Sequence, residues 1–271
     1  MSLERAGPTP PLVRCLRLFR LVLHLLQGLA TAAVVFPLVS NERQLAIIRR
    51  WSRSLLRVLN VRLRVHGTPP RGHAPTMIVS NHVSWLDIWV IHAVCPVRFV
   101  AKSDVRRWPM IGWLVARAGT IFIERDRRRD TARINRRIVE TLMRGERVGI
   151  FPEGTTTDGT HLRAFHASLF QPALEAGARV SSAAIRYPLH GAEPNPDASY
   201  TGERSLLESV RLILAQRTLR AEVTFCGALE PVGMTRRDLA HESHRLIAQA
   251  LGFSPHDSPP GTAGDPPAAV R

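Results

Sequence analysis

The chain has 271 residues, 45% of them hydrophobic, which fits one sizeable folded core with accessory segments. Its formal net charge is +15, from 37 basic and 22 acidic side chains, and this excess favours an anionic partner such as lipid or nucleic acid. The three cysteines lie far apart, and no glycine-rich loop of the dinucleotide or P-loop kind occurs, which argues against a disulfide framework, a zinc site and those nucleotide-binding folds.

The first quarter of the chain combines a long apolar run with most of the excess positive charge. Residues 1–71 carry twelve arginines against two glutamates. The run from Leu21 to Val39 approaches the roughly 20 apolar residues that span a bilayer. Arginines flank it on both sides, whereas a simple span should show an asymmetry of positive charge. We therefore expect a segment that dips into one leaflet and returns, rather than a spanning helix or a cleaved signal peptide.

The next segment, Glu42 to Leu59, has the pattern of a basic amphipathic helix. Its apolar residues recur at helical spacing, with arginines among them. Such a helix either lies in a lipid interface or packs as an ordinary surface helix, and the neighbouring apolar run favours the interface. Aromatic residues do not interleave with the arginines as single-strand nucleic acid binding requires, so no nucleic acid partner is expected. Residues 1–59 are therefore predicted to be a membrane-binding helix pair that meets an anionic membrane surface.

After Asn60 the pattern changes to strands that alternate with helices, which predicts an α/β fold with a mixed sheet flanked by helices over residues 60–252. The final segment, 253–271, is rich in proline and glycine and is predicted to be a disordered tail. Strands are expected at 61–65, 76–80, 97–101, 121–123, 148–151, 179–187 and 221–226. Helices are expected at 84–91, 104–118, 130–144, 203–216 and 236–251.

A histidine and an aspartate lie five residues apart directly after the second predicted strand. A carboxylate such as Asp87 can hold one ring nitrogen of His82 while the other nitrogen takes a proton. Residues five apart on a regular helix point roughly 140° away from each other, so the two side chains meet only if His82 lies in the turn before the helix. The same residues also fit a plain helix start, with Ser84 as N-cap and Asp87 as its capping-box partner. The two roles are compatible.

Three further polar blocks lie near predicted strand ends, where ligand sites of α/β sheets commonly form. They are Gly119 to Arg125, Phe151 to Thr157 and Val180 to Tyr187. Lys102, at another predicted strand end, is the only lysine in the chain. It is either an accidental surface residue or a site that needs a compact ammonium group in place of a guanidinium.

The ordered blocks N-H-x-S-x-x-D, G-x-I-F-I-[DE]-R and F-P-E-G-T, within about residues 60–190, resemble the glycerolipid acyltransferases typified by 1-acyl-glycerol-3-phosphate acyltransferase. The resemblance implies an enzyme that moves a fatty acyl group from acyl-CoA or acyl carrier protein to the hydroxyl of a lysolipid. The first acceptor it implies is 1-acyl-glycerol-3-phosphate, giving phosphatidic acid. It implies no cofactor and no metal, and a place on the cytoplasmic face of a bacterial inner membrane.

The resemblance also implies roles for single residues. His82 matches the general base and Asp87 the carboxylate that orients it, and because no covalent acyl-enzyme is required, Ser84 is expected to be a cap and not a nucleophile. Arg125 matches the arginine that holds the acceptor's phosphate. The remaining residues expected to bind substrate are Lys102, Gly119, Glu153, Gly154 and Thr155. A carboxylate beside a phosphate is repulsive, so Glu153 is expected to orient Arg125 or to bond backbone amides and hydroxyls.

Two departures from the family pattern bear on the acceptor. Many phosphatidic-acid-forming members carry arginine where this chain has Thr156, and loss of that charge favours another acceptor, such as lyso-ornithine lipid. The fourth block lacks the usual proline near Ser182, although Ile185 and Tyr187 still fit.

Two alternatives of other classes are a basic membrane-surface adaptor without chemistry and a thioester hydrolase.

Overall fold

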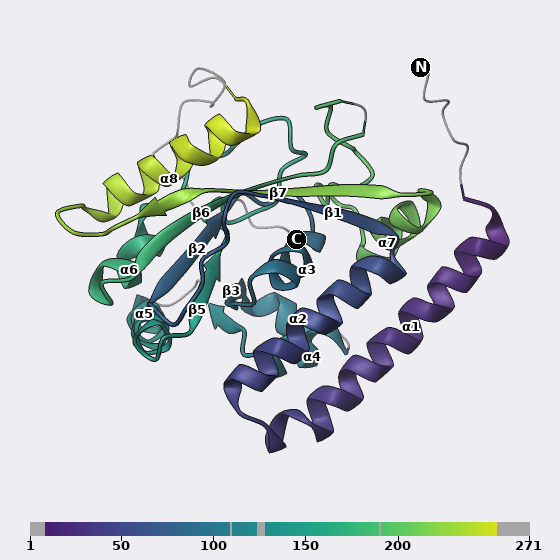
Figure 1. Ribbon diagram of the computed structural model, residues 1–271, viewed down its shortest axis with the longest axis horizontal. Coiled ribbons are helices and arrows are strands. Elements are labelled where there is room, and N and C mark those ends of the chain that lie inside the picture. Colours follow the sequence, from purple (N-terminus) through teal and green to yellow (C-terminus); the bar gives the residue numbers. More distant parts are fainter. Residues whose placement is uncertain (1–8, 109, 124–127, 190, 254–271) are drawn as a thin grey trace.

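The computed structural model describes residues 9–108, 110–123, 128–189 and 191–253 (Figure 1). Within them, seven strands form one sheet in the order β1-β7-β6-β2-β5-β3-β4. β6 and β7 are antiparallel and the other neighbouring strands are parallel, which confirms the predicted mixed sheet. The strands are β1 (Val61–His66), β2 (Thr76–Ser80), β3 (Arg98–Lys102), β4 (Ile121–Ile123), β5 (Arg147–Ile150), β6 (Arg179–Arg186) and β7 (Leu219–Leu229).

Helices cover both faces of the sheet, and each face has its own apolar core. One face packs against α2 (Asn41–Val58), α3 (Leu86–Val94), α4 (Ile111–Arg117) and α7 (Leu206–Ala215). The other packs against α5 (Arg128–Met143), α6 (Gln171–Glu175) and α8 (Arg236–Leu251). The described part of the chain also forms short 3-10 helices at η1 (Phe36–Leu38), η2 (Ser103–Arg107) and η3 (Ala167–Phe170). The long helix α1 (Pro11–Val34) lies outside α2, at the rim of the molecule (Figure 1).

The two N-terminal helices form a hairpin that is locked at its middle. The indole N–H of Trp51 donates to the carbonyl of His24 at 3.2 Å, and His24 Nε2 donates to the carbonyl of Trp51 at 3.1 Å. Their rings stack at 4.5 Å between centroids. A glycine is required next to this pair, since a Cβ on Gly28 would lie 2.7 Å from the indole nitrogen. The predicted helix pair is therefore present as a packed hairpin.

One side of α1 leaves a row of apolar side chains uncovered. Pro11–Leu38 is long and apolar enough to cross a membrane; its most apolar 18 residues have a mean hydropathy of 1.9, and only 22% of that stretch is buried. The uncovered residues repeat at intervals of three and four, which places them on one face of the helix. They are Leu12, Leu16, Phe19, Leu23 and Leu26, each about half exposed or more. We call this row the α1 stripe.

The helices predicted at 104–118 and 84–91 differ in the structure. The helix expected at 104–118 is divided into η2 and α4, because Trp108 precedes a proline in the sequence and has the extended backbone, ψ 125°, that a following proline enforces. The helix expected from Ser84 starts at Leu86, with Trp85 as its N-cap. Ser84 instead accepts a hydrogen bond from the Leu86 N–H at 3.3 Å, two residues on. The predicted tail lies outside the described residues, apart from Phe253.

Candidate active site

The candidate site lies where three parallel strands end at the same edge of the sheet. β2 is buried along its whole length and runs between β5 and β6, parallel to both. Parallel strands present their carboxyl ends together, so the segments that follow β2, β5 and β6 meet there. His82, Glu153 and Tyr187 each follow one of these strands within three residues. The sheet thus brings together three sequence blocks, of which the first and the last lie about 100 residues apart in the chain.

His82 and Asp87 meet, as their spacing requires, with His82 in the turn and Asp87 in the first turn of α3. His82 Nδ1 lies 2.8 Å from Asp87 Oδ2. Because a carboxylate only accepts, Nδ1 carries the hydrogen and Nε2 is left with a lone pair. Asp87 is fully buried, while 19% of the His82 side chain is exposed. The pair can therefore take a proton from a molecule that approaches Nε2.

Asp87 also makes one of the two bonds of the predicted capping box, the one from the Ser84 backbone, although Trp85 and not Ser84 is the N-cap of α3. Its Oδ2 accepts the backbone N–H of Val83 at 2.7 Å and of Ser84 at 2.9 Å, and its Oδ1 accepts the Tyr187 hydroxyl at 2.6 Å. The carboxylate therefore fixes the turn before α3 and holds the imidazole with the same atoms. Ser84 itself is fully buried, which keeps its hydroxyl away from any substrate.

Aromatic packing sets the plane of the His82 ring. The ring stacks on Phe151, the residue after β5, with 4.0 Å between centroids and 10° between planes. Phe151 stacks in turn on Phe99 of β3, at 5.3 Å. With Asp87 holding one nitrogen and Phe151 holding one face, the imidazole has little freedom to rotate, which keeps Nε2 in one direction.

Glu153 ties the loop after β5 to the loop after β2. Its Oε1 accepts the backbone N–H of His82 at 2.8 Å and its Oε2 accepts that of Arg163 at 2.9 Å. Of the two roles expected for Glu153, bonding backbone amides is thus the one the structure shows. Burial raises the pKa of this carboxyl to about 7. The two backbone donors lower the pKa, but their effect is smaller than that of burial.

Glu153 should therefore make stability depend on pH between about 4.5 and 7. The folded protein binds its proton more tightly than the unfolded chain, so the free energy of unfolding falls as pH rises through this window, by up to about 3 kcal/mol. We expect Glu153→Gln to lack this decline. Urea unfolding at several pH values measures it, with the exposed Glu140→Gln as the matched control. Equal slopes for wild type and Glu153→Gln would contradict the assignment.

The other residues expected to bind substrate are placed as follows. Gly154 and Thr155 follow Glu153, and Thr155 is exposed at the rim of a polar hollow. Lys102 is exposed at the end of β3, two strands from β2. Gly119 packs against buried Arg98, whose guanidinium would lie 2.5 Å from an added Cβ, so a larger side chain does not fit there. Arg125 lies outside the described residues.

Two contacts of the site were not anticipated from the sequence. One is the Tyr187 hydroxyl on Asp87, and the other is a clamp in which the Asn81 side chain donates to the Ile185 carbonyl at 2.9 Å and accepts its N–H at 2.7 Å. Asn81 and Tyr187 both lie in the blocks singled out above. The missing information was that β6 lies beside β2, which hydropathy patterns do not specify.

An α/β sheet with a partly exposed, carboxylate-held histidine at its carboxyl edge defines a class of site that removes a proton from a hydroxyl or a similar group. Comparison with known proteins narrows this class. The family model described as Acyltransferase matches residues 62–186. A solved structure titled as the 1-acyl-sn-glycerophosphate acyltransferase of Thermotoga maritima shares the fold, with a TM-score of 0.61 at 18% identity, and covers 87% of this chain and 96% of that one.

Curated relatives agree with the family model. A lyso-ornithine lipid O-acyltransferase of Pseudomonas aeruginosa is 38% identical over 205 residues, which span 76% of this chain and 78% of that protein. A 1-acyl-sn-glycerol-3-phosphate acyltransferase of Neisseria meningitidis is 43% identical over 147 residues, which span 54% of this chain and 57% of that protein. The chain therefore belongs to the acyltransferase family and is an acyltransferase, as the ordered blocks predicted.

Proposed function

We propose that the enzyme transfers a fatty acyl group from a thioester to the hydroxyl of a lysolipid, with His82 as general base and Asp87 as the carboxylate that orients it. The observation that carries this proposal is the pair itself. Nδ1 is held at 2.8 Å by a fully buried carboxylate, and the partly exposed ring leaves Nε2 for a substrate. The curated relatives are named as acyltransferases of two lysolipids, which supports the same class of acceptor.

The reaction balances without a covalent enzyme intermediate. His82 Nε2 takes the proton of the acceptor hydroxyl as its oxygen forms a bond to the thioester carbonyl carbon. The resulting tetrahedral oxyanion collapses, the carbon–sulfur bond breaks, and the leaving thiolate takes the proton back from His82. Either acyl-CoA or acyl carrier protein fits as donor, since one carries phosphates, the other is acidic, and this protein is basic.

The enzyme is proposed to work on the cytoplasmic surface of a membrane, with α1 embedded in one leaflet. Both ends of α1 return to the catalytic domain: the Arg17 side chain donates to the Gln216 carbonyl at 2.7 Å, and at the other end the chain turns into α2, which packs on α3. A helix attached at both ends lies along the domain and does not carry the chain across the membrane. Arginines on the exposed face of α2 complement anionic headgroups. They are Arg43, Arg49, Arg50 and Arg57.

The polar hollow beside the site favours a zwitterionic acceptor, as in lyso-ornithine lipid. Asp158, on its rim, is half exposed, and hydrogen bonds from Thr160 lower its pKa, so it is anionic at neutral pH. This carboxylate attracts an ammonium group and repels a phosphate, while Arg163 in the same hollow can pair with a carboxylate. Thr156, which many phosphatidic-acid-forming members replace by arginine, also lines it. A headgroup with one charge of each sign fits these partners.

The second candidate acceptor is 1-acyl-glycerol-3-phosphate. It is favoured by the exposed Lys102 at the end of β3 and by the 43% identity to the Neisseria relative named for that acceptor. Both candidates present a hydroxyl and a charged headgroup on one acyl chain. They differ in headgroup charge, which is the property that the hollow discriminates.

Acceptor choice is tested by offering the purified protein both donors with lyso-ornithine lipid or 1-acyl-glycerol-3-phosphate, and identifying products by mass spectrometry. We expect faster turnover of lyso-ornithine lipid. Asp158→Asn should shift the preference toward the phosphate acceptor by about tenfold, because one repulsive charge is removed. The control Glu175→Gln removes a negative charge from the exposed end of α6 and should leave the preference unchanged.

Outcomes other than faster turnover of lyso-ornithine lipid would each point to a different function. Faster turnover of 1-acyl-glycerol-3-phosphate by the wild type would reverse the order of acceptors. Free fatty acid without an acylated product would indicate a thioester hydrolase. Lipid binding without turnover of either donor would indicate an adaptor.

A further inference from the structure

We infer that Tyr187 is a positioning residue of the acyl transfer reaction, which holds the carboxylate of Asp87 in the plane that His82 requires. The inference rests on the proposed function, because it assigns Tyr187 a part in orienting the proposed base. It concerns the residue directly after β6, in a sequence block that carried no assigned role.

The hydrogen bonds of Asp87 are divided unequally between its two oxygens. Oδ2 accepts from His82 Nδ1 and from the backbone N–H groups of Val83 and Ser84, whereas Oδ1 accepts from the Tyr187 hydroxyl at 2.6 Å. The torsion that rotates a carboxylate is intrinsically broad and roughly two-fold, so its hydrogen bonds decide the plane of the group. A short bond to the second oxygen fixes the plane, and with it the direction in which Oδ2 meets the imidazole.

Tyr187 is suited to act as a permanent donor. Its side chain is buried, and burial, together with the negative charge of Asp87, raises the pKa of the phenol well above its ordinary value. The hydroxyl therefore keeps its proton at neutral pH and remains a donor to Asp87. A buried hydroxyl against a fully buried carboxylate also makes a stronger bond than the same pair in water.

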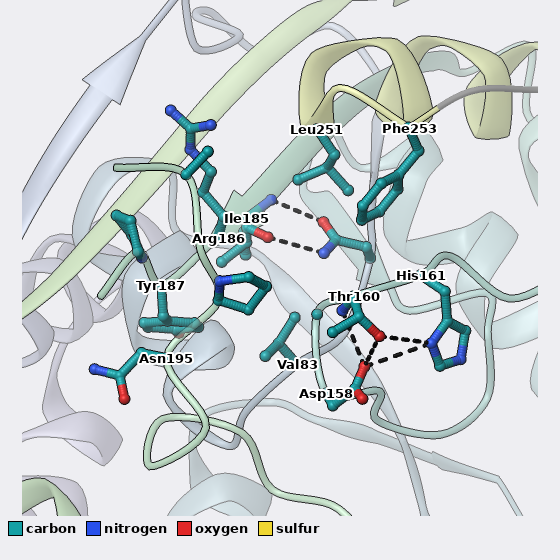
Figure 2. Close-up of a pocket in the computed structure, with 15 residues that line it drawn as sticks. Val83, Asp158, Thr160, His161, Ile185, Arg186, Tyr187, Asn195, Leu251 and Phe253 are labelled. Atoms are coloured by element: carbon teal, nitrogen blue, oxygen red, sulfur yellow. Dashed lines mark hydrogen bonds and ion pairs between the residues drawn. The ribbon is translucent and has the colours of Figure 1, made fainter. Parts of the chain in front are cut away.

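The backbone around Tyr187 is set so that the phenol reaches Asp87. The Asn81 clamp binds the N–H and carbonyl of Ile185, two residues before Tyr187, and so joins β6 to the loop that carries His82. Tyr187 also lines a cavity of about 210 Å³, with the Asp158–Thr160–His161 cluster on the opposite side (Figure 2). The phenol thus stands between this cavity and the buried carboxylate, and its placement is fixed by strand pairing and the clamp together.

Tyr187→Phe isolates the hydroxyl, because it keeps the ring and the packing. We expect kcat to fall about tenfold, which is the scale of a lost hydrogen bond to a charged group, with KM for donor and acceptor unchanged. Tyr200→Phe is the matched control, since Tyr187 and Tyr200 are the two tyrosines of the chain. A merely structural role would instead lower thermal stability without this change in kcat.

A double-mutant cycle with Asp87→Asn tests whether Tyr187 acts through Asp87. If it does, Tyr187→Phe should cost less than about twofold in kcat once Asp87 is already replaced. A full tenfold loss in that background would overturn the inference, as would unchanged kcat in the single variant. Activity that survives His82→Ala would instead overturn the proposed mechanism, so the two failures are distinguishable.

A spectroscopic measurement serves if Tyr187→Phe lowers stability too far for kinetics. In the Tyr200→Phe variant, Tyr187 is the one tyrosine left, so incorporated 3-fluorotyrosine gives a single fluorine resonance from this position. We expect that resonance to move when Asp87 is replaced by asparagine and to stay constant from pH 6 to 9. A resonance whose position is unchanged by Asp87→Asn would show that the phenol does not hold the carboxylate.

Discussion

Alanine in place of His82 is expected to abolish acyl transfer while the fold and the lipid association persist. The imidazole is proposed to take the hydroxyl proton, and a positioned general base contributes about 10²–10⁴-fold to such a reaction. Steady-state turnover of lysolipid by the purified variant measures the effect. His66→Ala, which removes an exposed imidazole from the end of β1, is the matched control and should retain full activity. Turnover near that of the wild type would exclude His82 as the base.

Vesicle flotation separates the loss of chemistry from the loss of lipid binding. The His82→Ala variant should float with anionic vesicles as the wild type does. The double variant Phe19→Asp/Leu23→Asp, which puts charge into the α1 stripe, should lose flotation but still acylate lysolipid dissolved in detergent. Val232→Asp, at an apolar residue that is 88% exposed beyond β7, is the matched control and should keep both flotation and activity. Flotation of the α1 double variant at the wild-type level would exclude the stripe as the lipid-binding surface.

Much of the fold follows from patterns that are local in the sequence. The continuous apolar run of β2, the helical repeat of α2 and the polar blocks at strand ends each reflect the surroundings of a few neighbouring residues, and their positions were predicted closely. The interruption between η2 and α4 was missed although a proline marks it, because the apolar residues on both sides keep a helical spacing. Strand β7, parallel to β1 and antiparallel to β6, proved longer than the predicted 221–226 because its two ends pair with these strands.

The sequence predicted those contacts of the site that join residues close together in the chain. The contact between His82 and Asp87 depends on one turn, so their spacing showed where it could form, and the resemblance of the ordered blocks made it the expected arrangement. Glu153 and Tyr187 lie 71 and 100 residues from their partners, and only the order of the strands brings them together. Spacing in the sequence carries no information on that order. For Glu153, the chemistry of a carboxylate beside a phosphate still pointed to bonding with backbone amides, which the structure shows.

The three loops at the sheet edge act as one unit. Glu153 holds the backbone of His82 from the β5 side, Tyr187 holds Asp87 from the β6 side, and Asp87 joins both to the imidazole. Each contact restrains a different degree of freedom: the position of the His82 backbone, the plane of the carboxylate and the rotation of the ring. A base that must meet a hydroxyl and a thioester within about 3 Å needs all three, because small errors in orientation lower the rate steeply.

Asparagine in place of Asp87 distinguishes an orienting carboxylate from a helix cap. The amide has nearly the same shape but carries no charge. Its oxygen can still accept at the position of Oδ2, where three N–H groups point, but it does not stabilise the imidazolium that forms when Nε2 takes the proton. We expect turnover to fall by about 10³–10⁴-fold, as at other carboxylates that orient a catalytic histidine.

Comparison with a residue that is only a helix cap shows what a loss of turnover in Asp87→Asn would mean. Thr235→Ala removes the N-cap of α8, which has a complete capping box outside the site, and should cost about 1 kcal/mol of stability with turnover intact. Were Asp87 only a cap for the turn before α3, Asp87→Asn would behave in the same way. A large loss of kcat with a small shift in Tm therefore shows that Asp87 acts on the histidine, since a cap stabilises the helix without changing the protonation state of an imidazole.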